Sequence, residues 1–219
     1  MDEYFTVYIP STFAVTDPAK LAALIESNSF ATLVSKDADS LFASHLPFLY
    51  RPAQGAHGTL LSHMARANRH WKLFETGGES LVIFTGPHAY ISPTFYAAEV
   101  AVPTWNYANV HIYGIAKIVE SDTGLDAILD ETISKHESGC TAPWTSNLPP
   151  EMRANLKKAI VGFEIEITRI EGKFKLGQNR STEDREKMLA ILQSSPDTEV
   201  QRLATLMERE LREPTPQQP

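Results

Sequence analysis

The sequence predicts an α+β fold, a barrel-like β domain with peripheral helices and a C-terminal helical extension. Strand-like segments occupy most of the first two thirds of the chain, with short helical patterns between them. Residues 163–167 alternate between apolar and polar side chains, as a half-buried strand does. After Lys175 the spacing of apolar residues becomes helical. These three observations indicate a sheet that is built first and then flanked by helices.

The elements follow in order along the chain. Asp17 and Pro18 suit a helix start, and Leu21, Leu24 and Ile25 then share one helical face. Strands are expected at 30–35, 41–50, 58–62 and 79–84, with a helix at about 65–74. The later pattern predicts a strand at 110–119, a helix at 125–135, the strand at 163–167 and two amphipathic helices split at 194–196.

Composition narrows the class of protein. The 219 residues carry 27 acidic and 20 basic side chains, a formal net charge of −7, which lacks the electrostatic footprint of a DNA-binding domain. The one cysteine, Cys140, excludes an internal disulfide framework and fits a reducing compartment. The acidic start MDEYFTVYIP does not resemble a signal peptide, and no apolar run reaches spanning length. We therefore expect a cytoplasmic protein with no membrane partner.

Residues 84–114 form the densest cluster of aromatic, proline and histidine residues. Pro87, Pro93 and Pro103 interrupt the segment too often for one buried element. Aromatic faces with polar tips suit a site for a flat, partly polar ligand. Trp105, Tyr107 and Tyr90 fit the core of a dimer interface equally well.

Residues 60–71 predict an anion site. A strand ends there in hydroxyl and imidazole groups and a helix is expected to follow, so that Ser62, His63, Arg66 and Asn68 could bind a phosphate together with backbone N–H groups. A solvated helix start explains the same residues equally well.

Other chemistry finds little support in the sequence. The histidines at 45, 63, 70, 88 and 111 show no zinc-binding spacing, and ordinary hydrogen-bonded histidine is the better interpretation for each, with a heme ligand as an alternative for one. No G-x-S-x-G, GxGxxG or Walker motif occurs. No side chain stands out as a catalytic acid or base, although His63 and His111 could titrate near neutrality.

Six ordered segments resemble one family. They are YIPSTF, SHLPF, HMARANRHW, FTGPHAYISPTFY, VPTWNYANVHIYG and GFEIEITRIEGKFKLGQNR, and they extend from Tyr8 to about Arg180. Together they resemble the PaiB-type family of FMN-binding negative transcriptional regulators. The family motif KLSQN departs at Gly177, where this chain has KLGQN. That difference removes one hydroxyl group from the segment.

The resemblance implies a homodimeric split β-barrel, related to pyridoxamine-phosphate oxidases, with FMN in a cleft between subunits. Residues 1–180 would form this FMN-binding domain, 181–212 helices packed on the barrel, and 213–219 a disordered tail. Ser62, His63, Arg66 and Asn68 would hold the phosphate, and His45 would run along the ring edge. The resemblance further places these residues at the flavin: Thr104, Trp105, Asn109, Lys175 and Gln178.

Three functions remain open at this stage. The first is a flavin-binding protein that regulates gene expression directly or through a flavin-dependent step, or acts as a flavin-dependent oxidoreductase. The second is a repressor that binds DNA itself, which the charge disfavours. The third is a heme-binding relative. The C-terminal helices argue against DNA recognition, because the second, residues 197–211, carries more acids than its two arginines.

Overall fold

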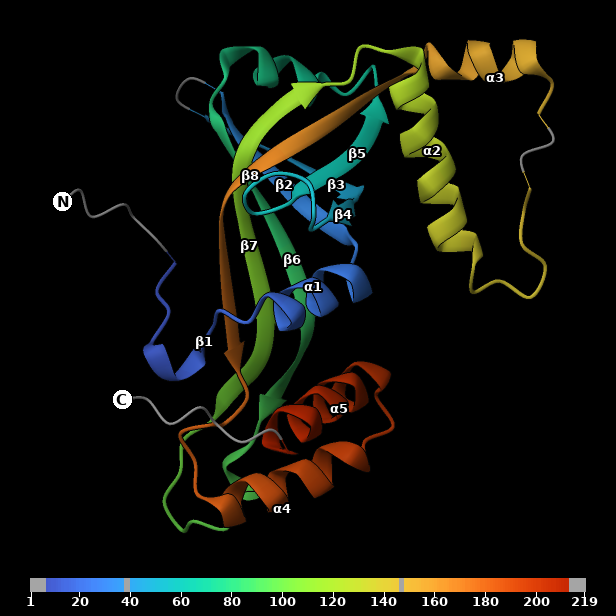
Figure 1. Cartoon of the computed structure of the whole chain (residues 1–219). Coiled ribbons are helices and arrows are strands. Elements are labelled where there is room, and N and C mark those ends of the chain that lie inside the picture. The colour runs from blue at the N-terminus through green and yellow to red at the C-terminus, as the bar shows by residue number, and fades with distance from the viewer. Residues whose placement is uncertain (1–6, 38–39, 146–147, 213–219) are drawn as a thin grey trace. The chain divides into compact units, whose positions relative to one another are not determined.

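The computed structural model describes residues 7–37, 40–145 and 148–212 (Figure 1). The chain divides into two compact units. Unit 1 takes the N-terminal segment up to Asp17, Thr85–Val110 and the chain from Glu171 onward. Unit 2 takes Pro18–Phe84 and His111–Ile170.

The strands form one sheet of eight in the described residues, and its order is β3-β2-β6-β7-β8-β5-β4 with β1 paired to β8. All the pairings that can be assigned a register are antiparallel. The strands are β1 (Ala14–Val15), β2 (Phe30–Asp37), β3 (Ser40–Pro47), β4 (Leu49–Arg51), β5 (Thr59–Ala65), β6 (Glu79–Ile91), β7 (Thr104–Ile118) and β8 (Ile160–Lys175). Because β6, β7 and β8 are long, each contributes residues to both units.

The helices lie between and after the strands. The α-helices are α1 (Pro18–Ser27), α2 (Asp122–Glu137), α3 (Pro150–Lys157), α4 (Thr182–Gln193) and α5 (Thr198–Arg212). The 3₁₀ helices are η1 (Ser11–Phe13), η2 (Arg69–Thr76) and η3 (Pro93–Phe95). Among the described residues no helix combines the length and the apolar character needed to cross a membrane.

Unit 2 has an aromatic core. Phe48 packs edge-on against Phe84 and Phe163, with ring centroids 5.9 and 6.2 Å apart, and Phe74 lies 5.0 Å from Phe163. A smaller cluster on another surface of the sheet joins Leu49 and Leu61 to Ile128 of α2. These contacts fix β5 from both sides, because Leu60 and Leu61 are both almost fully buried.

Unit 1 is organised by the helix pair α4 and α5, which lie side by side (Figure 1). The side chain of Asp184 on α4 accepts hydrogen bonds from the backbone N–H groups of Ala97 and Ala98, at 2.8 and 3.1 Å. Lys187 on the same helix donates to the carbonyl of Tyr96 at 2.6 Å. Helix α4 therefore holds the segment that follows η3.

Two differences from the sequence-based expectations concern element boundaries. The helix expected at 65–74 is a 3₁₀ helix that begins at Arg69, because Asn68 caps it by accepting from the N–H of His70 at 3.1 Å. The proline-rich segment is more regular than its sequence indicates. Strand β6 continues through Pro87, which lies beyond the residues of β6 that pair with β2, and Pro93 is the first residue of η3.

Candidate functional site

The sequence-predicted site residues fall equally into the two units. His45, Ser62, His63, Arg66 and Asn68 belong to unit 2, whereas Thr104, Trp105, Asn109, Lys175 and Gln178 belong to unit 1. The two groups are therefore described separately.

In unit 2, Ser62 and Asn68 are engaged in the interior of the unit. The Ser62 hydroxyl is 1% exposed and donates to the carbonyl of Pro47 at 2.6 Å. The Asn68 amide donates to the Ser44 hydroxyl at 2.9 Å while its oxygen caps η2. Both side chains thus hold neighbouring segments in place.

His70 is the centre of the same network. Its ring is fully buried, with Nδ1 2.9 Å from the Ser44 hydroxyl and Nε2 2.9 Å from the Ser35 hydroxyl. Ser35 continues to Ser80 at 2.7 Å. Desolvation lowers the pKa of His70 to about 4, so the ring is neutral at physiological pH. The interpretation of His70 as an ordinary hydrogen-bonded histidine is confirmed.

His63 points away from Ser62, because consecutive residues of a strand face opposite sides of the sheet. It shares its face with Leu61, which packs against Ile128 of α2. Its Nδ1 atom is buried and has no hydrogen-bond partner among the described residues. Burial lowers the pKa of His63 below its usual value. Ser62 and His63 therefore do not converge on one point through their side chains.

The Arg66 guanidinium is bound to the protein backbone. Its Nε donates to the carbonyl of Lys158 and its Nη2 to that of Ile160, both at 2.9 Å. The backbone N–H of Arg66 also donates, to Ala159 at 2.8 Å. Much of the donor capacity that a phosphate would use is thus occupied within the chain.

The last member of this group is His45, which lies exposed on β3 opposite Thr32. The role of the whole group at a flavin phosphate and ring edge stays a prediction.

In unit 1 the predicted residues gather on β7 and β8. The Lys175 ammonium donates a short hydrogen bond to the Thr104 hydroxyl. Trp105 is 53% exposed, and its ring centroid lies 6.1 Å from those of His88 and Tyr90 on β6. The cluster of residues 84–114 thus contributes an aromatic surface and the Thr104 hydroxyl group at the start of β7, and β8 adds the Lys175 cation at its end.

Asn109 shares the strand face of Trp105 and Tyr107, since alternate residues of a strand lie on one side. Its Oδ1 atom is buried and has no hydrogen-bond partner in the described part of the chain. A buried acceptor without a partner costs about 1–3 kcal/mol, so it calls for an explanation. A ligand with an N–H donor would supply that partner.

Gln178 folds back onto its own turn. Its amide donates to the Phe174 carbonyl at 2.5 Å, and its oxygen accepts from the Leu176 N–H at 2.7 Å. Between them, Gly177 has a φ of 84°, and an added Cβ would lie 2.9 Å from the Cε atom of Met188. The glycine that departs from the family motif therefore suits both the left-handed backbone and the close approach of α4.

Sequence reasoning placed Lys173 and Lys175 on one face of a strand but missed the contacts of Lys173 with two tyrosine rings. The Lys173 ammonium lies 5.5 Å from the ring centroid of Tyr107 and 5.4 Å from that of Tyr8. It also donates to the Tyr8 carbonyl at 2.8 Å.

The antiparallel sheet, with its long central strands and flanking helices, has the split-barrel fold. Solved structures support this class. The flavocytochrome Anf3 from Azotobacter vinelandii aligns with a TM-score of 0.57 and 14% identity, over 74% of this chain and 69% of that chain. The FAD and heme binding protein from Mycobacterium smegmatis aligns with a TM-score of 0.55 and 15% identity, over 74% and 73%.

Residues 7–169 match the family model described as "Putative FMN-binding domain", and the chain belongs to this family. It is 36% identical to the protease synthase and sporulation protein PAI 2 of Bacillus subtilis, over 94% of this chain and 99% of the relative. It is 30% identical to an uncharacterized protein of Emericella nidulans, over 84% of this chain and 89% of that protein. The predicted membership of the PaiB-type family is confirmed.

Proposed function

We propose that this protein binds FMN as a homodimer and regulates gene expression through a flavin-dependent step. The family match over residues 7–169 supports a flavin, and the buried Oδ1 atom of Asn109 is the observation that carries the assignment to this face of β7. An isoalloxazine ring is flat and carries an N–H group beside carbonyl oxygens. The face of β7 offers it an acceptor and an aromatic ring.

The residues of unit 1 fit such a group. Asn109 would accept from the ring N–H, Trp105 would offer an aromatic wall, and Lys175 would donate to a flavin oxygen from the end of β8. Bound FMN would supply electron transfer, while the protein supplies position and electrostatics. Lys175 is held by Thr104, so its charge is already oriented before a ligand arrives.

The regulatory part of the proposal draws on the Bacillus relative, whose name refers to protease synthesis and sporulation. The net charge of −7 favours regulation through a flavin-dependent step over direct contact with DNA.

The first test is a visible absorption spectrum followed by FMN titration. Asn109→Ala should weaken FMN binding about tenfold, because one hydrogen bond to a buried group is lost. Asn28→Ala is the matched control, since Asn28 belongs to unit 2 and its amide donates to Leu24 and Ser27 at the end of α1. Equal affinities for wild type and Asn109→Ala would remove Asn109 from the site. A Soret band in place of a flavin spectrum would make heme the cofactor.

The predicted role of Arg66 at the FMN phosphate is tested by comparing the FMN affinities of two variants. If Arg66 binds the FMN phosphate, Arg66→Ala should weaken FMN binding more than Lys173→Ala does. Fluorescence titration of both variants decides it, and equal affinities would contradict the assignment.

A reporter of the regulated genes then tests the function, because an Asn109→Ala strain should lose repression together with FMN binding.

A further inference from the structure

Unit 2 contains a cavity of about 430 Å³ that is separate from most of the predicted flavin residues. The end of β7, the start of α2, the end of α3 and the start of β8 line it, together with Arg66 and Trp71. Of the ten residues predicted at the flavin, Arg66 alone belongs to this lining. The volume suits a small organic molecule.

Two cations at the cavity have no carboxylate partner in the part of the chain that the structure describes. Arg66 donates to two backbone carbonyls, and the Lys158 ammonium donates to the amide oxygen of Asn155 at 3.1 Å. Neither contact neutralises a positive charge. Both side chains are exposed, so the charges are accessible to a ligand that enters from solvent.

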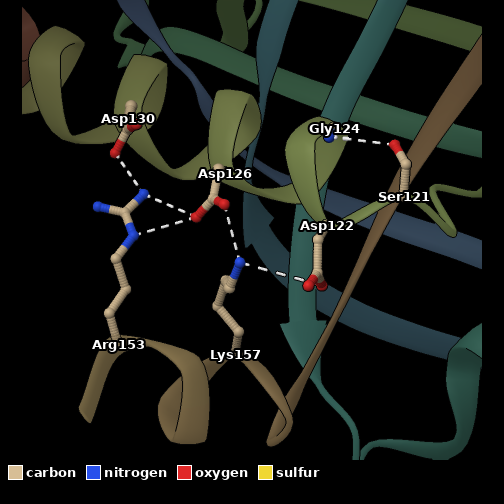
Figure 2. A network of polar contacts seen from close by, with 7 residues as sticks. All are labelled: Ser121, Asp122, Gly124, Asp126, Asp130, Arg153 and Lys157. Atoms are coloured by element: carbon tan, nitrogen blue, oxygen red, sulfur yellow. Dashed lines mark hydrogen bonds and ion pairs between the residues drawn. The ribbon is translucent and has the colours of Figure 1, made fainter. Parts of the chain in front are cut away.

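A third cation, Lys157, is already neutralised, as Figure 2 shows. Its ammonium lies 2.8 Å from an oxygen of Asp126 and 3.9 Å from one of Asp122. Hydrogen bonds from Lys157, and then from Arg153, lower the pKa of Asp126, so that this carboxylate stays charged and keeps Lys157 in place. Glu120 is the remaining carboxylate of the lining. Because Asp126 balances Lys157, the formal charges of Glu120 and Asp122 offset those of Arg66 and Lys158, but no ion pair joins these two carboxylates to these two cations among the described residues.

Most of the remaining lining is apolar. Trp71 is anchored by a hydrogen bond from its Nε1 to the Arg66 carbonyl at 3.0 Å. Leu125 and Val161 are buried beside it in the lining. An added Cβ at Gly162 would lie 2.8 Å from a methyl group of Leu125, so the glycine lets α2 approach β8 at this point. The cavity therefore combines an aromatic and aliphatic wall with cations at one side.

We propose that this cavity binds a small organic anion, a carboxylate or phosphate monoester with an aromatic or aliphatic body, at a site distinct from the flavin. The ammonium of Lys158 and the Nη1 group of Arg66, which the two backbone contacts leave over, receive the anionic group, and Trp71 with Leu125 covers the apolar body. Occupancy of this site is a route by which a metabolite could act on the proposed regulator. The binding site itself does not depend on the flavin assignment.

The test is calorimetric titration of phenyl phosphate and benzoate into protein saturated with FMN. Saturation blocks binding of the probes to the flavin phosphate site, Arg66 included if it holds the FMN phosphate, so that probe binding which persists belongs to a second site. We expect saturable binding with a Kd at or below about 1 mM, and no binding of the neutral analogue benzyl alcohol. The same titration without FMN reports on the cavity even if the protein proves to bind no flavin.

Three variants test whether the heat of probe binding comes from the cavity. Lys158→Gln should weaken binding of both probes about tenfold, since one charge-assisted contact is lost. Ala154→Trp should abolish it, because Ala154 lines the cavity from α3 and is exposed enough to accept the larger side chain without unfolding. Lys72→Gln is the matched control, since the Lys72 ammonium lies 5.6 Å from the Trp71 ring centroid but Lys72 does not line the cavity.

The titrations of the variants can be interpreted once their melting temperatures show that each variant is folded. Loss of probe binding in Lys158→Gln and Ala154→Trp, with unchanged FMN affinity, supports the second site. Probe binding that is absent, or equal in all variants, overturns the proposal. A parallel loss of FMN affinity in Lys158→Gln also overturns it, because the cavity would then be the phosphate end of the flavin site.

Discussion

His70 is the residue whose surroundings most alter its chemistry. Both ring nitrogens meet serine hydroxyl groups, and Phe42 and Phe74 lie 4.9 and 5.9 Å from its ring centroid. A protonated ring would be a buried charge with no carboxylate partner in the hydrogen-bond network that the described residues form around it. The neutral ring instead links β2 and β3 to η2.

This arrangement predicts a stability that falls on acidification. The pKa of His70 is about 4 in the folded protein, below the usual 6.5, so its contribution is fully present above pH 6.5 and is lost as pH falls toward 4. The loss is on the order of 3 kcal/mol across that window. Urea unfolding at pH 7 and pH 4.5 measures it, with His70→Gln expected to show a much smaller difference between the two. His45→Gln, at an exposed position, should keep the wild-type difference.

Single residues also show where sequence reasoning ends. Only the resemblance places Asn109 at the flavin, whereas the structure adds that its buried Oδ1 lacks a hydrogen-bond partner among the described residues. Ser62 and His63 were predicted together because they are adjacent in sequence, yet their side chains lie on opposite faces of β5. The partners of Arg66 could not be inferred, because they are backbone carbonyls more than 90 residues away along the chain.

At the scale of elements, the type of most segments was predictable and their length was not. Alternation at 163–167 marks only the middle of β8, which runs from Ile160 to Lys175. The apolar pattern changes along this strand because it passes from unit 2 into unit 1 and meets different neighbours. Helix α3 was missed, since Met152 and Leu156, its large apolar residues, are exposed and leave no clear buried stripe.

The N-terminus of α4 offers a test of helix capping. Ser181 caps it by accepting from the N–H of Asp184 at 3.1 Å. Ser181→Ala should lower the free energy of unfolding by about 1 kcal/mol, the usual cost of a lost N-cap. Chemical denaturation measures the change. Ser138→Ala, at the exposed end of α2, is the control and should stay within about 0.5 kcal/mol of wild type. Equal losses in the two variants would contradict a specific capping role for Ser181.

Asp184 shows a second pH effect at the same helix, in a separate window. Hydrogen bonds from the N–H of Ala98, and then of Ala97, lower the pKa of its carboxyl below the usual 3.8. Its contribution to stability is therefore present above pH 3.8 and is lost only as pH falls through the lower folded value. His70 and His63, whose pKa values burial lowers, contribute to acid effects below pH 6.5, whereas the effect of Asp184 appears only below pH 3.8.

Amide exchange tests this contact of α4. Asp184→Asn should speed exchange at Ala97 and Ala98, because a neutral amide oxygen accepts these two hydrogen bonds less strongly than a carboxylate does. Glu183→Gln removes a neighbouring exposed charge and should leave both amides protected. Unchanged exchange in Asp184→Asn would show that other contacts hold the segment.

For the whole molecule, charge and surface aromatic residues point to protein association instead of DNA binding. The net charge of −7 repels phosphates, and bound FMN would add further negative charge. By contrast, Tyr90 and Trp105 are 50% and 53% exposed although they lie on β6 and β7, neighbouring strands within the sheet. Half-exposed aromatic residues on inner strands are typical of surfaces that a partner covers.

If a second copy of the chain covers this surface, the purified protein should sediment with twice the mass of one chain. Tyr90→Asp should then weaken dimerisation at least about 30-fold, because a central aromatic contact is replaced by a charge that the interface must desolvate. Tyr8→Asp is a stringent control, since Tyr8 also belongs to unit 1 and is 82% exposed. It should leave the dimer intact. Sedimentation of all three proteins over a range of concentrations decides the question. A monomeric wild type would contradict the dimer, whereas an unchanged dimer in Tyr90→Asp would move the interface away from Tyr90 and leave the exposed aromatic surface to the flavin alone.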